Sequence, residues 1–119
     1  MPIDNVLNPS AIAALKSVSP DDGGEFFNEL VDIFLADMPV RLTEIDTSLA
    51  QGDGPTLQRA AHSIKGASGN FGATALAEIA HKIELLARTG QVESVKAELA
   101  PLAAEFAKVT AALAEVRVK

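Results

Sequence analysis

The chain has 119 residues, 48% of them apolar, which is enough for one domain with a single hydrophobic core. It contains no cysteine, which excludes a disulfide scaffold, a thiolate metal site and a cysteine nucleophile. Acidic residues outnumber basic ones 16 to 10, and the net charge of −6 argues against nucleic acid as a partner, because phosphate backbones select basic surfaces. No apolar run approaches the roughly 20 residues of a membrane helix, and the N-terminus does not resemble a signal peptide, so we expect a cytoplasmic protein without membrane contact.

The apolar residues recur at helical spacing and nowhere alternate over the length of a strand, which predicts an all-α fold. Helices are expected over residues 9–17, 25–51, 55–69, 73–89 and 92–116. The short connections favour antiparallel neighbours, so the sequence predicts an antiparallel up-and-down four-helix bundle with a short additional N-terminal helix. We expect residues 1–119 to form a single domain, and we expect a monomer because one chain supplies all four long helices.

Two prolines and the N-terminal arm add detail to this fold. Pro39 and Pro101 lie inside predicted helices, and each is expected to kink its helix, because proline removes a backbone donor and clashes with the preceding turn. Ahead of the first helix, Ile3, Val6 and Leu7 are expected to pack on the bundle.

The outer face of the third helix carries an unusual set of residues. When this helix is unrolled at about 100° per residue, His62 points away from the apolar stripe, Lys65 lies on the flank at i+3, and Gly66 follows at i+4. A glycine inside a helix costs about 1 kcal/mol relative to alanine, so Gly66 predicts a bare patch where a large partner approaches. Gly69 leaves the same side of the helix without a side chain one turn further on.

These residue types suit nucleophilic phosphoryl transfer. An exposed imidazole is largely neutral near pH 7, so one ring nitrogen has a lone pair that can attack phosphorus. A lysine one turn away can neutralise part of the charge on the phosphoryl group. On these residues alone, a surface histidine beside an ordinary helix lysine remains an alternative interpretation.

The segment from Ala61 to Ala73, with the sequence AHSIKGASGNFGA, resembles the signature of histidine-containing phosphotransfer (HPt) domains. The resemblance covers nearly the whole chain. Flanking residues of the types usual in such domains are Phe34, Pro39, Leu76, Ile83 and Glu84.

The resemblance implies a role for four residues. His62 would be the phosphoacceptor, Lys65 the charge partner of the phosphoryl group, and Gly66 the small residue that lets the partner reach the histidine. Glu84 stands where related domains often have Gln or Glu near the imidazole, and it would orient the ring.

The resemblance also implies a phosphorelay intermediate of two-component signal transduction rather than an enzyme. The protein would accept a phosphoryl group from the phospho-aspartate of one receiver domain and pass it to another. Its partners would be receiver domains of hybrid sensor kinases and response regulators. It would need no cofactor of its own, because the receiver would hold the Mg²⁺.

The alternative hypothesis is a non-catalytic helical adaptor that binds a signalling partner while its histidine is inert. The glycine at position 66 argues against an adaptor, because an inert copy has no reason to keep it. His81, on the fourth helix, is expected to be a solvated surface residue, and a metal pair with His62 would lack the carboxylates of a stable site. Leu85 is expected to point outward too, where it could belong to an apolar docking patch.

Overall fold

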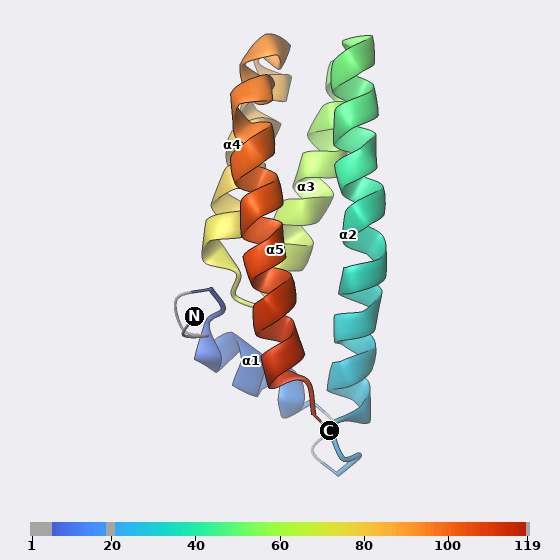
Figure 1. The fold of residues 1–119 in the computed structure, drawn as a ribbon, viewed down its shortest axis with the longest axis vertical. Coiled ribbons are helices and arrows are strands. Elements are labelled where there is room, and N and C mark those ends of the chain that lie inside the picture. Colours follow the sequence, from blue (N-terminus) through green and yellow to red (C-terminus); the bar gives the residue numbers. More distant parts are fainter. Residues whose placement is uncertain (1–5, 19–20, 119) are drawn as a thin grey trace.

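The computed structural model describes residues 6–18 and 21–118, and every regular element in those ranges is a helix (Figure 1). In chain order the elements are α1 (Pro9–Lys16), α2 (Glu25–Gln51), α3 (Gly54–Asn70), α4 (Thr74–Arg88), the 3₁₀ helix η2 (Val92–Glu98) and α5 (Leu99–Val116). Helices α2 to α5 run alternately up and down along the long axis of the molecule, and α1 crosses one end of the bundle at an angle (Figure 1). The antiparallel four-helix bundle with a short N-terminal helix is therefore confirmed. No helix in the described ranges is long and apolar enough to cross a membrane.

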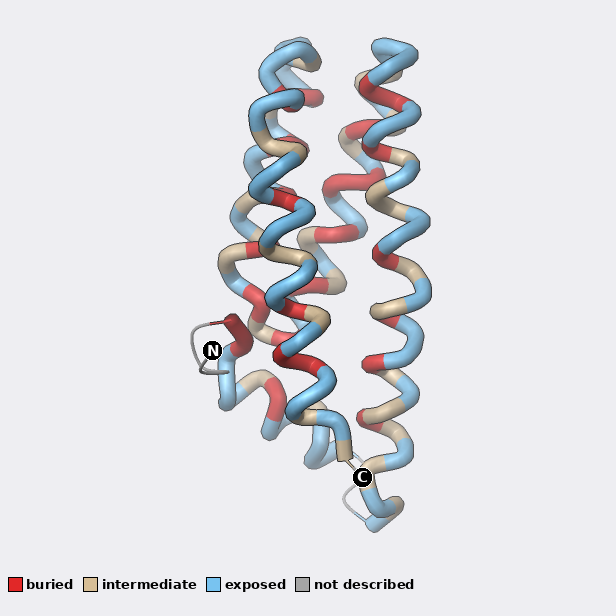
Figure 2. Tube along the Cα trace, in the orientation of Figure 1, coloured by how far each residue is buried: buried red, intermediate tan, exposed pale blue. Residues whose placement is uncertain are grey.

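The core lies along the centre of the bundle, where each long helix turns its apolar stripe inward (Figure 2). Phe34 of α2 connects this helix to the C-terminal end of α3 and to α5. Its ring centroid lies 5.2 Å from that of Phe71, which follows α3, and 6.2 Å from that of Phe106 in α5. Burying each large apolar side chain contributes about 1.5–3 kcal/mol, so this continuous core fixes α3 and α4 in place. Val6 and Leu7 of the N-terminal arm are buried as predicted, whereas Ile3 lies outside the described residues.

Both ends of α3 are set by the local sequence. At its start, the Asp53 side chain accepts a hydrogen bond of 3.2 Å from the backbone N–H of Thr56, and Pro55 occupies the first turn, where its missing N–H is not needed. At its end, Gly72 adopts a left-handed conformation with φ of +67° and turns the chain into α4. The cap at Asp53 and the turn at Gly72 therefore determine where α3 begins and ends.

Replacing Gly72 with alanine is expected to lower the free energy of unfolding by about 2–4 kcal/mol. The positive φ disfavours any side chain, and a Cβ atom would overlap the Cβ atom of Asn8 and lie 2.7 Å from its backbone nitrogen. The control is Gly69→Ala, since Gly69 is helical and faces open space. The free energy of unfolding of this variant is expected to rise by up to about 1 kcal/mol. Urea denaturation measures both, and equal stabilities of the two variants would contradict this account.

The prediction of one continuous helix over residues 92–116 is wrong for its first seven residues, which form η2. Helix α5 begins at Leu99, so Pro101 lies in its first turn, where N–H groups have no partner within the helix. Extending the α-helix backwards would need a hydrogen bond from Pro101 to the carbonyl of Ala97, which proline cannot donate. The expected kink at Pro101 is therefore a helix start. Helix α2 extends on both sides of Pro39, and the kink expected there stays a prediction.

Candidate functional site

His62 projects from the outer face of α3, and 67% of its side chain is exposed. The opposite face of the same helix packs into the core, where Leu57, Ala61 and Ile64 are each at most 1% exposed. The helical period therefore places the imidazole outside the bundle, as the sequence predicts.

Glu84 of α4 is a buried carboxylate at the centre of the site, with only 8% of its side chain exposed. Its Oε2 atom lies 2.7 Å from Nδ1 of His62, and its Oε1 atom accepts a hydrogen bond of 2.6 Å from Nζ of Lys65. An ionised carboxylate can only accept hydrogen bonds, so this contact selects the His62 tautomer with its proton on Nδ1. Nε2 is then the nitrogen with a free lone pair.

The environment of Glu84 keeps its carboxylate ionised. Burial raises the pKa of Glu84, but the hydrogen bonds from Lys65 and His62 and their positive charge favour the ionised form, and the net result is a pKa below its usual value. The structure therefore joins a histidine, a lysine and a glutamate from two helices in one charged cluster.

The low pKa of Glu84 predicts that the free energy of unfolding decreases as the pH falls through the acidic range. Because the pKa in the folded state lies below the unfolded value of about 4.5, the stabilisation is present above pH 4.5 and is lost as the pH drops through the folded pKa. Urea denaturation between pH 7 and pH 3 measures it, and the stability difference between the wild type and Glu84→Gln is expected to shrink towards low pH. A difference that stays constant over this range would contradict the prediction.

His81, which the sequence predicts to be a solvated surface residue, is a further member of this cluster. Its side chain is 52% exposed, yet its Nδ1 atom lies 3.5 Å from Nζ of Lys65 and 3.6 Å from Oε1 of Glu84. The i,i+3 spacing of His81 and Glu84 on α4 was visible in the sequence, but the reach of Lys65 from α3 was not. Within the described ranges, no group of three or more His, Asp or Glu side chains could hold a metal ion.

The surface around His62 is unobstructed on its C-terminal side. A Cβ atom added at Gly66 or Gly69 would meet no other atom within 4 Å, and both residues are exposed. Leu85 of α4 is also exposed, as predicted. The glycines are therefore not required by packing within the chain.

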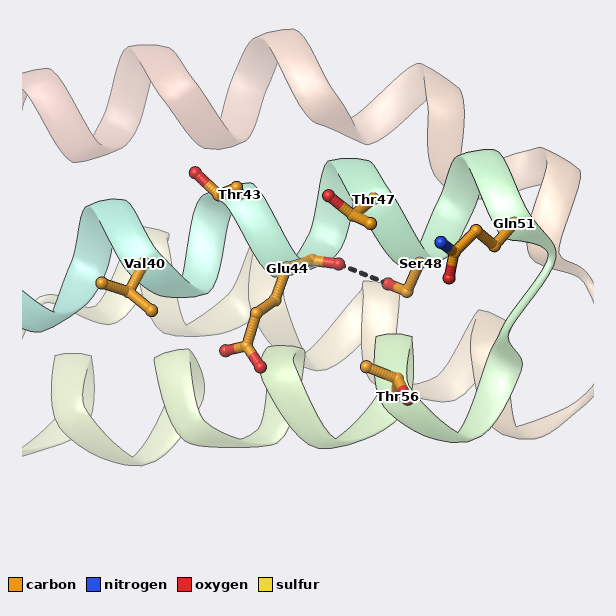
Figure 3. Close-up of a pocket in the computed structure, with 7 residues that line it drawn as sticks. All are labelled: Val40, Thr43, Glu44, Thr47, Ser48, Gln51 and Thr56. Atoms are coloured by element: carbon orange, nitrogen blue, oxygen red, sulfur yellow. Dashed lines mark hydrogen bonds between the residues drawn. The ribbon is translucent and has the colours of Figure 1, made fainter.

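Two surface grooves lie on different sides of α3. One lies beside the imidazole and is lined by Pro55, Gln58, Arg59, His62 and Glu84. The other, between α2 and α3, has a volume of about 370 Å³ and is lined mainly by threonine, serine and glutamine side chains, with one valine and one glutamate, Glu44 (Figure 3). It contains none of the four predicted site residues, whereas the groove beside the imidazole contains His62 and Glu84.

Comparison with known proteins identifies the family of this chain. The Hpt domain family model matches residues 29–118. The chain is similar to histidine-containing phosphotransfer protein B (HptB) from Pseudomonas aeruginosa PAO1, with a TM-score of 0.84, 33% sequence identity and 93% of each chain covered. It shares its fold with the HPT domain from the Hpt sensor hybrid histidine kinase from Shewanella, with a TM-score of 0.68, 24% identity, and 88% of this chain and 90% of that chain covered. No curated protein matches the chain significantly.

The family model spans most of the chain, and the match to HptB extends over nearly all of it. The match also includes the helix that presents His62 to solvent and the helix that supplies Glu84. The protein thus belongs to the Hpt domain family, and its role is histidine phosphotransfer in a phosphorelay.

Proposed function

We propose that His62 carries the phosphoryl group and that Nε2 is the atom that bonds to phosphorus. The observation that supports this assignment is the contact of 2.7 Å between Nδ1 of His62 and Oε2 of Glu84. It holds one ring nitrogen against a buried carboxylate, while most of the imidazole is exposed to an approaching partner. Because the ring is fixed by α4 and carried by α3, its orientation is set before a partner binds.

The transfer then needs no proton to enter or leave the site. The lone pair of Nε2 attacks the phosphorus of an aspartyl phosphate on a receiver domain, the N–P bond forms, and the P–O bond to the departing aspartate carboxylate breaks. Nδ1 keeps its proton, so the ring becomes cationic, and the carboxylate of Glu84 stabilises this charge. Onward transfer reverses these steps, because the aspartate of a second receiver attacks the phosphorus and the neutral ring of His62 is restored.

Lys65 is the charge partner in this proposal. Its side chain is 33% exposed, and its ammonium group is bound to Oε1 of Glu84 in the unmodified protein. A lysine has three donors, so Lys65 has hydrogen atoms left for a phosphoryl oxygen while it stays bound to Glu84. It would thus stabilise both the phosphoryl group and the carboxylate that orients His62.

The partners in this proposal are the receiver domains of hybrid sensor kinases and response regulators, and the Mg²⁺ of the reaction is held by carboxylates of the receiver. Residues 1–119 act as a single phosphotransfer domain, and the protein is monomeric, since one chain closes its own four-helix core. Its place of action in this proposal is the cytoplasm. The protein is a carrier that each cycle regenerates, not an enzyme that releases a product.

Incubation with a receiver labelled on its phospho-aspartate tests the proposal. Label is expected to appear on this chain in a bond that is labile in acid and stable in alkali, as for a phosphohistidine. ¹⁵N NMR of the labelled protein is expected to place phosphorus on Nε2 of His62. An acid-stable bond, or phosphorus on Nδ1, would contradict the assignment.

Gly66→Leu is expected to slow transfer from the receiver by about tenfold or more, because the new side chain would occupy the bare surface beside His62. The free energy of unfolding is expected to rise, since leucine favours the helix by up to about 1 kcal/mol over glycine. Single-turnover transfer and urea denaturation measure the two effects. Gly66→Ala is the control, with a similar gain in stability and a smaller loss of rate, and full transfer by Gly66→Leu would contradict the steric role.

A further inference from the structure

The charges of the site are already matched before any phosphoryl group arrives. Glu84 contributes one negative charge, and the ammonium of Lys65 lies 2.6 Å from it. The same ammonium is 3.5 Å from Nδ1 of His81, so Lys65 is engaged on the α4 side of the site. A phosphoryl group adds about 1.5–2 negative charges, and the cationic ring of His62 balances about one of them, so up to about one negative charge remains without a partner.

Arg59 supplies a cation on the other side of the imidazole. It lies one turn before His62 on α3, and it lines the groove that also contains His62 and Glu84. Its side chain makes one weak contact, a hydrogen bond of 3.3 Å from Nη2 to the hydroxyl of Thr56. Among the residues that the structure describes, Arg59 forms no ion pair, because no carboxylate oxygen lies within 4.0 Å of its guanidinium group. The charge of Arg59 acts on the carboxylate of Asp53 only over a longer distance.

The geometry of a helix turns the imidazole towards this arginine. Side chains on an α-helix lean towards its N-terminus, so the ring of His62 lies over the turn that carries Gln58 and Arg59. The groove accordingly contains residues of that turn and does not contain Lys65. A phosphoryl group on the exposed nitrogen of His62 would therefore lie between Lys65 on one side and Arg59 on the other.

We propose that Arg59 is a second cationic partner of the phosphoryl group on His62 and binds its oxygens from the N-terminal side of the groove. A guanidinium group presents its donors in a planar fork that matches two phosphoryl oxygens, which an ammonium group does not. Residues three apart on a helix are about 5–6 Å apart at Cβ, so the long arginine side chain spans the distance. The inference rests on the proposed function of His62.

The test uses the full chain phosphorylated on His62. ³¹P NMR titration of the phosphoryl group is expected to give a pKa about 0.5–1 unit higher in Arg59→Gln than in the wild type, because a nearby cation favours the dianion. In a mixture with one receiver, the equilibrium is expected to shift about three- to tenfold towards the phosphorylated receiver. Arg59→Lys should bring both quantities part of the way back to their wild-type values, since lysine keeps the positive charge but lacks the planar fork of donors.

Lys108→Gln is the matched control, because it removes one positive charge from a residue that lines a different groove on α5, and both quantities should stay at their wild-type values. Unchanged phosphoryl pKa and equilibrium in Arg59→Gln would overturn the inference about Arg59 while leaving His62 as the phosphoacceptor. Slower transfer at an unchanged phosphoryl pKa would also overturn it and would assign Arg59 to receiver docking. Failure of the wild type to take label on His62 would overturn both proposals.

Discussion

His62→Gln is expected to abolish phosphoryl acceptance, with transfer from a labelled receiver reduced by at least about 1000-fold. The amide of glutamine has a similar reach and can still donate a hydrogen bond to Glu84, but its nitrogen has no lone pair available to attack phosphorus. Because most of the His62 side chain is exposed, the substitution removes little packing, and the helical circular dichroism signal should be unchanged. Label incorporation at a fixed receiver concentration measures the loss.

His81→Gln is the matched control for this substitution, since it changes the second histidine of the same cluster. It is expected to retain transfer within about threefold of the wild type, because His81 is not the nucleophile and lies near Lys65 only at 3.5 Å. If His81→Gln loses the label and His62→Gln keeps it, the assignment of the phosphoacceptor is wrong.

Glu84→Ala is expected to reduce the rate of transfer by about 100-fold, because the carboxylate both selects the tautomer of His62 and stabilises the cationic ring. Without it, Nδ1 loses its partner at 2.7 Å, the ring can rotate, and either nitrogen can carry the proton. Lys65 also loses its partner at 2.6 Å, so its ammonium is no longer held in place. Single-turnover kinetics with a phosphorylated receiver measure the effect.

Glu84→Gln separates orientation from charge. Its amide oxygen can still accept a hydrogen bond from Nδ1 of His62, but its neutral side chain does not stabilise a cationic ring. We expect a rate between those of the wild type and Glu84→Ala. A wild-type rate in Glu84→Ala would show that the carboxylate has no part in the transfer.

The helices were predictable because their signals are local. The spacing of apolar residues, the glycines at φ near +67° and the prolines next to loops each act within a few residues, so most predicted boundaries differ from the observed ones by about one residue. The exception is the segment before Pro101, for which the sequence predicts one long helix. There the apolar pattern continued into η2, but the backbone donor missing from Pro101 ended the α-helix.

The site was predictable only in part, because it depends on the register between two helices. The outward direction of His62 and the open surface at Gly66 follow from the geometry of α3 alone. The contacts of Lys65 with Glu84 and of both with His81 need the relative positions of α3 and α4, which packing of the whole core decides. For the same reason, the groove that contains Arg59 was not visible in the sequence.

The groups that hold the imidazole come from one short stretch of chain. His62 and Glu84 are 22 positions apart, Lys65 and Glu84 are 19, and Lys65 and His81 are 16. Joining positions at such small separations loses little chain entropy. The site therefore depends on the register of a single helical hairpin, and α1, η2 and α5 act on it only through the packing that keeps α3 and α4 in that register.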